Sequence, residues 1–380
     1  MPSRPLVAIA ALLLSSAAAA DEWQWATETA ASLERAPESS PESLLAHCGA
    51  PDRALQRVAE KLIERKQRDL PYLDSDGLTF AERVMGAPYV WPRAWIVSAK
   101  ALSHDDLAKR LDVWRAGFKD EGTRLCGLAR GKAKDGTEIV AAIAVDAPAT
   151  MDPIPTRART GQWITLRAAM HVPASGARVV LLAPNEAPRN LPSSFANGTV
   201  TSRFALTRPG EFTVQVLADL AGGPRPVLEA NLFADVDPPP FTPDLAAPGE
   251  DAANGATGET ALLAMVGALR KGAALPPLKR SVDLDKLARA HAEEMKRAKK
   301  VAHNLGHGDP SERVEAAGLT ARETGENVAH AQSVKLAHRA LYASPSHRAN
   351  LLKKEFTHVG IAVIDDPDGS VWACEVFTRE

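Results

Sequence analysis

Two histidines and one glutamate in the last third of the chain are the residues best suited to chemistry. His303 begins a loop-like stretch, because the glycines and the proline that follow it break regular structure. Glu326 precedes a short apolar stretch, and His347 lies near the start of a predicted helix. Imidazole and carboxylate groups together can ligate a divalent metal or transfer a proton. The same segments contain two further polar side chains, Asn327 and Ser344.

The predicted helix that carries His347 begins at Ser344-Pro345, because serine caps helices and proline suits the first helical position. His347 then lies in the first turn, where the helix dipole disfavours an added proton and keeps the ring neutral. A neutral ring can bind a metal or act as a base. By contrast, His291 lies on the apolar face of a helix that starts near Leu284, so we interpret it as a core residue bonded to a backbone carbonyl.

Several segments of this region, in this order, resemble the bacterial branch of the CAP superfamily: His303, Gly325 to Ala329, Ser344 to Asn350, Phe356 and Val359 to Ala362. The superfamily comprises the cysteine-rich secretory proteins, antigen 5 and the pathogenesis-related class 1 proteins, and its domain is also called the SCP domain. The resemblance covers only the last third of the chain. Each motif is weak alone, and their ordered set is what carries the resemblance.

The resemblance implies an α-β-α sandwich, an extracellular location and a central cleft in which two histidines and two acids hold a divalent metal such as zinc. By motif position the histidines are His303 and His347, and one acid is Glu326. The second acid has no clear counterpart: Ser344 lies near its expected place, and Leu341 replaces a common aromatic residue. Two histidines, one carboxylate and a water can still form an open zinc site. The alternative is that these groups form a structural hydrogen-bonded network.

Three functions are compatible with this pattern. Because the family is associated with sterol and lipid binding, the resemblance implies a binding module for a lipid, an apolar compound or a cell-envelope component. The alternatives are a metal-dependent hydrolase that uses the His/Glu site and a structural or interaction protein at the cell surface. The chain lacks an H-E-x-x-H motif, a nucleophile elbow, a P-loop and a dinucleotide fingerprint, and Cys374 lies in an alternating strand typical of the core. We therefore favour a non-enzymatic binding module.

The first residues have the pattern of a secretory signal peptide, with cleavage near Ala20. Arg4 precedes a short apolar run, and a small-residue A-x-A site follows it. No later stretch is apolar for long enough to span a bilayer. We expect export to the periplasm or the cell exterior. Because 45 basic residues balance 47 acidic ones without long blocks of one sign, nothing favours binding to nucleic acid.

The mature chain is predicted to be a multi-domain α+β protein. We expect an N-terminal α+β domain over residues 21–149, a β-sandwich over 150–236, a linker over 237–257 and the CAP-like domain over 258–380. Period-two alternation and turn signals such as Asn197-Gly198 favour an immunoglobulin-like architecture for the sandwich. The proline-rich linker should be extended and mobile. Because Cys48 and Cys126 share one predicted domain and Cys374 lies in another, we expect a Cys48–Cys126 disulfide.

Landmarks of the C-terminal domain recur in the N-terminal one in the same order, which suggests an internal repeat. The matched pairs are Asp52 to Leu55 with Leu284 to Leu287, Glu82-Arg83-Val84 with Glu312-Arg313-Val314, and Gly127-Leu128-Ala129 with Gly360-Ile361-Ala362. We hypothesise that the N-terminal domain is a diverged CAP-like copy. His47 and His104 do not fall in matching motifs, so the copy would lack the histidine site.

Overall fold

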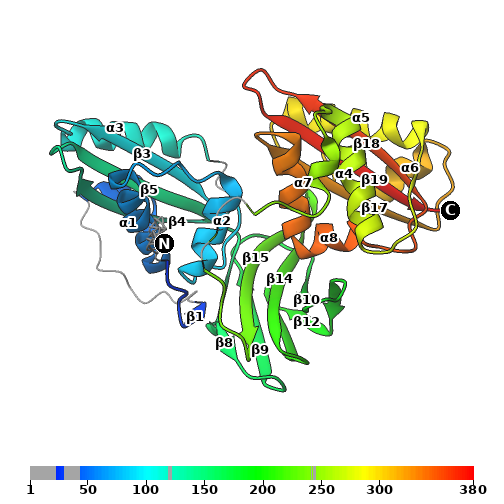
Figure 1. Cartoon of the computed structure of the whole chain (residues 1–380), viewed down its shortest axis with the longest axis horizontal. Coiled ribbons are helices and arrows are strands. Elements are labelled where there is room, and N and C mark those ends of the chain that lie inside the picture. Colours follow the sequence, from blue (N-terminus) through cyan, green and yellow to red (C-terminus); the bar gives the residue numbers. More distant parts are fainter. Residues whose placement is uncertain (1–22, 30–42, 119–121, 241, 243–244) are drawn as a thin grey trace, which may run out of the picture.

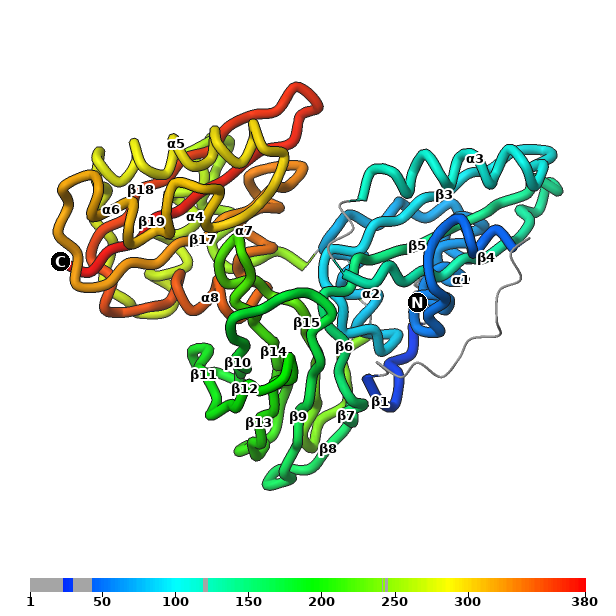
Figure 2. The backbone as a smooth tube through the Cα atoms, turned by 180° about the vertical axis from the view of Figure 1, so that it is seen from behind, coloured from blue at the N-terminus to red at the C-terminus, as the bar shows by residue number. Residues whose placement is uncertain are grey.

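The computed structural model describes residues 23–29, 43–118, 122–240, 242 and 245–380, and the predicted signal peptide lies outside them. Figure 1 shows a central all-β domain, drawn in green, with an N-terminal domain in blue and cyan on one side and a C-terminal domain in yellow to red on the other. Seen from behind in Figure 2, the central strands run up towards the space between these two flanking domains. No helix within the described residues is long and apolar enough to span a bilayer.

The N-terminal domain has one sheet with the strand order β2-β4-β5-β3, formed by Ala50–Pro51, Thr123–Lys132, Glu138–Ala147 and Arg93–Ala99. Its helices are η1 (Leu44–His47), α1 (Arg53–Gln67), α2 (Ser75–Val84) and α3 (His104–Arg115). The side chain of Asp52 caps α1 by accepting from the Leu55 amide at 2.9 Å. The predicted Cys48–Cys126 disulfide is confirmed, and it links η1 to β4.

The central domain consists of two sheets. One has the order β11-β10-β14-β15-β8 and the other β12-β13-β9-β6. The strands are β6 (Ala149–Met151), β8 (Arg157–Ala158), β9 (Trp163–Met170), β10 (Gly176–Leu182), β11 (Arg189–Leu191), β12 (Ser193–Ala196), β13 (Thr199–Ala205), β14 (Gly210–Leu220) and β15 (Gly223–Ala234). A separate two-stranded pair joins β1 (Glu28–Thr29) to β7 (Ile154–Pro155). The predicted turn at Asn197-Gly198 joins β12 to β13. The immunoglobulin-like comparison stays a prediction.

The linker differs from its prediction in its second half. Instead of being extended there, it forms a short 3-10 helix, η2 (Glu250–Ala253), that packs against the C-terminal domain. Glu250 is buried and accepts two hydrogen bonds from the guanidinium of Arg339, at 2.8 and 2.9 Å. A bidentate ion pair with a residue 89 positions away fixes this segment, which composition alone does not reveal.

The C-terminal domain also has one sheet, with the order β16-β18-β19-β17, formed by Lys279–Arg280, His358–Asp365, Val371–Arg379 and Glu323–Ala331. Its helices are α4 (Gly258–Gly272), α5 (Val282–Ala298), α6 (Pro310–Ala316), α7 (Val334–Ala343) and α8 (Pro345–Leu351). One face of the sheet packs on α5, and the other on α4 and α7. The two faces therefore have separate hydrophobic cores, and the sheet lies between layers of helices.

The N-terminal and C-terminal sheets have the same strand order and the same strand directions. In each, a two-residue strand pairs in parallel with the first strand of a hairpin, and a helix follows that short strand at once. Gly127 and Gly360 mark the same point in the two hairpins. A Cβ atom on either would lie 2.1 Å from a backbone carbonyl carbon, that of Leu55 in one domain and that of Leu284 in the other.

This correspondence shifts one of the sequence matches. The short strands and the glycines place Leu55 opposite Leu284, three residues away from the match of Leu55 with Leu287. The sequence could not distinguish the two registers, because a shift of three residues keeps apolar positions on nearly the same helix face. A pair of side chains agrees with the corrected register. Gln56 accepts a hydrogen bond from the amide after Gly127, and Asp285 accepts one from the amide after Gly360.

Candidate functional site

Glu326 lies at the centre of the polar cluster in the C-terminal domain. It is on β17, its side chain is fully buried, and both carboxylate oxygens have partners. The Nδ1 atom of His303 lies 2.8 Å from Oε1, and the guanidinium of Arg313 forms an ion pair with Oε2. Cys374 contributes a third, weaker contact, with its Sγ atom 3.6 Å from Oε2. The structure therefore brings together His303 and Glu326, two of the residues that the resemblance implied for the cleft.

The charge of Glu326 is balanced inside the cluster. Burial raises the pKa of its carboxyl, but the hydrogen bond with His303 and the positive charges of His303 and Arg313 outweigh burial and hold the pKa below its ordinary value. Arg313 also donates to the backbone carbonyl of His303 at 2.6 Å and to that of Gly308 at 2.8 Å. The same guanidinium thus pairs with the carboxylate and fixes the loop that presents the histidine.

His347 and Ser344 form a second pair, at the start of α8. Ser344 is the N-cap residue, and Pro345 takes the first helical position as predicted, but the Ser344 hydroxyl does not bond to a helix amide. It lies 2.9 Å from Nδ1 of His347 instead. Burial, followed by the nearby charge of His303, lowers the pKa of His347 to about 3. The ring is therefore neutral at physiological pH, as expected from its place in the first helical turn.

Asn327 faces away from Glu326. Successive side chains of a strand point to opposite faces of its sheet, and Asn327 accordingly lies on the α8 side. Its Nδ2 atom donates to the backbone carbonyl of His347 at 3.2 Å and to the carboxyl of Glu375 at 3.0 Å. Asn350 donates in turn to Oδ1 of Asn327 at 3.0 Å. Asn327 therefore supports the backbone of α8 rather than the His303–Glu326 pair.

The central domain covers this cluster. The Nε2 atom of Gln215, on β14, donates to Ser344 Oγ at 2.9 Å, and Oε1 of Gln215 accepts from the Ser346 amide at 3.1 Å. At the turn between β14 and β15, the Gly222 carbonyl accepts from the amide of His303 at 2.9 Å and from that of Asn304 at 3.1 Å. Figures 1 and 2 show the ends of β14 and β15 reaching this part of the C-terminal domain.

The expected metal does not fit this arrangement. Within the described part of the chain, no group of three or more His, Cys, Asp or Glu side chains is placed to hold a metal ion. The guanidinium of Arg313 already occupies Oε2 of Glu326, and Nδ1 of His303 occupies Oε1. A cation bound at Glu326 would have to compete with the positive charge of Arg313. Zinc ligation by His303, His347 and Glu326 stays a prediction, and no chemical step is derived from it.

Sequence reasoning missed three members of the cluster, Arg313, Glu375 and Gln215. It interpreted His291 and Cys374 as core residues, and both are buried. Nε2 of His291 lies 2.8 Å from the Ala302 carbonyl oxygen, as expected, and 3.7 Å from Oε1 of Glu326. Strand alternation contained one available signal: Glu375 is a charged residue in an otherwise apolar strand, which indicates a buried polar contact.

Glu375 provides a pH-dependent prediction. Burial raises the pKa of its carboxyl to about 7, although the hydrogen bond with Asn327 acts in the opposite direction, and Oε1 has no hydrogen-bond partner in the described structure. The unfolded chain ionises this group above a pH of about 4.5, whereas the folded protein keeps it protonated until about 7. As the pH rises from about 4.5 to about 7, the free energy of unfolding should therefore fall, by an amount on the order of 3 kcal/mol.

We expect Glu375→Gln to remove this loss, because the amide stays neutral and still offers an oxygen to Asn327. Urea unfolding at pH 4 and pH 8 measures the effect. The variant should match the parent protein at pH 4 and exceed it at pH 8. The exposed Glu315→Gln is the control and should change neither value. Equal stability of Glu375→Gln and the parent protein at pH 8 would contradict the prediction.

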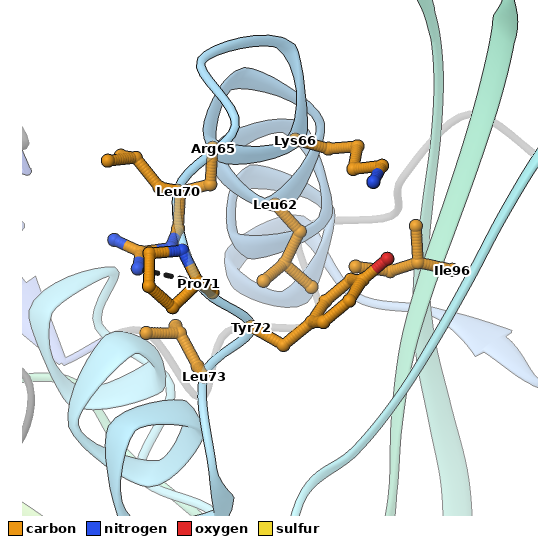
Figure 3. A pocket seen from close by; sticks show the side chains of 8 residues that line it. All are labelled: Leu62, Arg65, Lys66, Leu70, Pro71, Tyr72, Leu73 and Ile96. Carbon is orange, nitrogen blue, oxygen red and sulfur yellow. Dashed lines mark hydrogen bonds between the residues drawn. The ribbon is translucent and has the colours of Figure 1, made fainter.

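The N-terminal domain lacks the corresponding polar residues. The register of the two sheets and the helix positions place Leu62, Ala94 and Ala142 where the C-terminal domain has His291, Glu326 and Glu375. Leu62 lines a pocket of about 10 Å³ next to the side chain of Tyr72, as Figure 3 shows. That volume holds at most one water. The N-terminal domain therefore has apolar side chains at these three positions, and its buried polar residues, among them Asp52 and Glu82, are at other positions.

Comparisons with known proteins assign the C-terminal part of the chain. Residues 263–376 match the model of the cysteine-rich secretory protein (CAP) family. The uncharacterized protein YkwD of Bacillus subtilis is 30% identical over 116 residues, which are 30% of this chain and 44% of that protein. The chain thus spans less than half the length of this curated relative.

Solved structures give weaker likenesses. An outer surface protein of Borrelia burgdorferi is 19% identical with a TM-score of 0.31, and the likeness covers 36% of this chain and 99% of that one. An extracellular protein containing an SCP domain from Bacillus anthracis is also 19% identical, with a TM-score of 0.30, over 57% of this chain and 78% of that one. The assignment depends on the family match and the curated relative. Residues 263–376 therefore match the cysteine-rich secretory protein (CAP) family, and the bacterial relative supports the same similarity for this part of the chain.

Proposed function

We propose that this protein is an exported, non-enzymatic binding module for a lipid, an apolar compound or a cell-envelope ligand. One observation supports a non-enzymatic role: the histidine and carboxylate groups are hydrogen-bonded within the cluster, and the central domain packs against it. His303 is paired with Glu326, whose second oxygen is paired with Arg313. His347 is neutral, is bonded to Ser344 and lies beside the contact with Gln215. A hydrolase needs a base beside space for substrate, and neither histidine lines the cavity of about 770 Å³ beside this cluster.

Export is part of the proposal. The leader pattern of residues 1–20 supports it, although that segment lies outside the described residues. The Cys48–Cys126 disulfide also supports it, because such bonds persist in oxidising compartments and are rare in the cytosol.

The N-terminal domain is proposed to be a diverged CAP-like copy with a structural role. The shared strand order and the matching approach of Gly127 and Gly360 to a helix backbone support this origin. With Leu62, Ala94 and Ala142 in the corresponding positions, the copy lacks counterparts of His291, Glu326 and Glu375.

Ligand uptake tests the proposed function. We expect the full mature chain to take up a fluorescent lipid from vesicles in a saturable way, with displacement by unlabelled lipid and without release of fatty acid or headgroup. The unfolded, reduced chain serves as the control for nonspecific adsorption. A lack of saturable uptake across sterols, phospholipids and fatty acids would count against a lipid ligand. Turnover of any of them would replace the binding module with the hydrolase alternative.

Elemental analysis tests the metal prediction separately. Because Arg313 occupies the carboxylate of Glu326, we expect the purified mature protein to contain substoichiometric zinc. We expect the same content in the His303→Ala/His347→Ala variant. One metal ion per chain in the parent protein, lost in that variant, would restore the metal site and contradict the interpretation given above.

A further inference from the structure

A cavity of about 770 Å³ lies between the central domain and the CAP domain, beside the contact made by Gln215. One wall comes from the end of β10, the segment after it and the start of β14, and includes Glu211 and Thr213. The other wall comes from α7, α8 and neighbouring segments, and includes Tyr342 and Arg348. Pockets for small molecules have volumes of about 300–1,000 Å³. The cavity is therefore large enough for a ligand, whereas the histidine cluster is covered.

Arg348 places a guanidinium in this cavity that has only part of its hydrogen-bond donors bonded. Its Nε atom donates to the Tyr342 backbone carbonyl, and its guanidinium carbon lies 3.9 Å from the centre of the Tyr342 ring. These contacts fix the plane of the guanidinium. The terminal nitrogens have no hydrogen-bond or ion-pair partner among the residues that the structure describes. A guanidinium held in this way is prepared for a carboxylate, which it can bind with two parallel hydrogen bonds.

Glu211 supplies an anion on the opposite wall. It is exposed, and Oε1 accepts a hydrogen bond from Nδ2 of Asn231 at 2.6 Å, which orients the carboxylate. Within the described residues Glu211 has no ion-pair partner. Burial lowers the pKa of Arg348, whereas Tyr342 and Glu211 raise it, so the two charges are within electrostatic reach of each other without forming an ion pair.

The geometry points to a small zwitterion as the ligand of this cavity, with its carboxylate on Arg348 and its ammonium group on Glu211. Apolar side chains that also line the cavity, among them Leu182, Leu275 and Leu352, favour an apolar body. A short peptide with free ends and apolar side chains has these properties. This inference rests on the proposed function as a binding module, and it gives that module a site and a ligand class.

Three forms of one dipeptide test the inference on the full mature chain by calorimetric titration. Leu-Leu has both charges, N-acetyl-Leu-Leu lacks the ammonium group, and Leu-Leu amide lacks the carboxylate. We expect Leu-Leu to bind and each blocked form to bind about tenfold more weakly or worse, because each loses one charge-assisted contact. Failure of Leu-Leu to bind, or equal binding of all three forms, would overturn the inference. If only Leu-Leu amide binds more weakly than Leu-Leu, the cavity recognises the carboxylate alone, and the inference of a zwitterion site is overturned as well.

Two variants test which residue binds each charged group of the dipeptide. Arg348→Gln should weaken the binding of Leu-Leu about tenfold and remove the difference in affinity between Leu-Leu and Leu-Leu amide. Glu211→Gln should weaken the binding of Leu-Leu by a similar factor and remove the difference in affinity between Leu-Leu and N-acetyl-Leu-Leu. Arg203→Gln is the matched control, because Arg203 also lies over an aromatic ring, that of Trp163, but does not line the cavity. Discrimination that persists in both cavity variants would contradict the assignment. Dipeptide binding without lipid uptake would overturn the lipid ligand alone, and lipid uptake without dipeptide binding would overturn this inference alone.

Discussion

Gly360→Ala is expected to destabilise the CAP domain by about 3 kcal/mol or more, because the added methyl group has no space. A Cβ atom there would lie 2.1 Å from the backbone carbonyl carbon of Leu284 and 2.4 Å from its oxygen. Backbone atoms cannot rotate away as a flexible side chain can. Helix α5 would have to move off the sheet, and its buried residues, which include Ala288 and Met295, would lose their packing. Denaturant unfolding of the full chain measures the loss.

Gly267→Ala is the matched control for this prediction. Gly267 lies inside α4, and a Cβ atom added to it meets nothing within 4 Å. Alanine suits a helix interior better than glycine, so this variant should be neutral or more stable by about 0.5–1 kcal/mol. Gly127→Ala should destabilise the N-terminal domain as Gly360→Ala destabilises the CAP domain, since its Cβ atom would meet the backbone of Leu55 at the same 2.1 Å. Wild-type unfolding of Gly360→Ala would show that α5 does not lie so close to β18.

The sequence was sufficient for the parts of the site that depend on local pattern. The resemblance placed His303 and Glu326 in one cleft, and Ser344-Pro345 predicted where α8 begins. The start of α8 depends on residues close to one another in the chain, so local preferences determine it. The contact between His303 and Glu326 joins residues 23 positions apart, and the neutral ring of His347 is due first to burial, so both depend on the fold.

Other features depend on contacts that local pattern does not encode. Gln215 is 129 residues from Ser344, and nothing in the alternation of β14 indicates which domain its polar face contacts. Arg313 lies on a short helix whose direction is known only from the fold. The sequence could have predicted that Asn327 points away from Glu326, because adjacent side chains of a strand point to opposite faces of the sheet.

A second large effect is expected at Glu229, where the three domains meet. Its carboxylate forms an ion pair with Arg83 of α2, and it also accepts a hydrogen bond from Nε2 of Gln215, which bonds to Ser344 at the start of α8. The side chains of Arg83 and Glu229 are 13% and 4% exposed. Burial lowers the pKa of Arg83 to about 10, and its Nε atom has no hydrogen-bond partner in the described structure. One carboxylate thus stabilises a buried cation and holds the residue that covers the cluster.

Glu229→Ala is therefore expected to cost about 3 kcal/mol of unfolding free energy, because it removes the ion-pair partner of the buried guanidinium of Arg83 and leaves only the more distant carboxyl groups of Glu211, Asp76 and Glu82. Glu229→Ala/Arg83→Met should recover part of the loss, since removing both charges removes the desolvation penalty. Arg110→Ala breaks the exposed pair with Asp106, whose side chains are 53% and 50% exposed, and should cost less than about 1 kcal/mol. If Glu229→Ala costs no more than that surface variant, the buried pair does not hold the domains together, and the cover over His303 and His347 must depend on Gln215 and Gly222 alone.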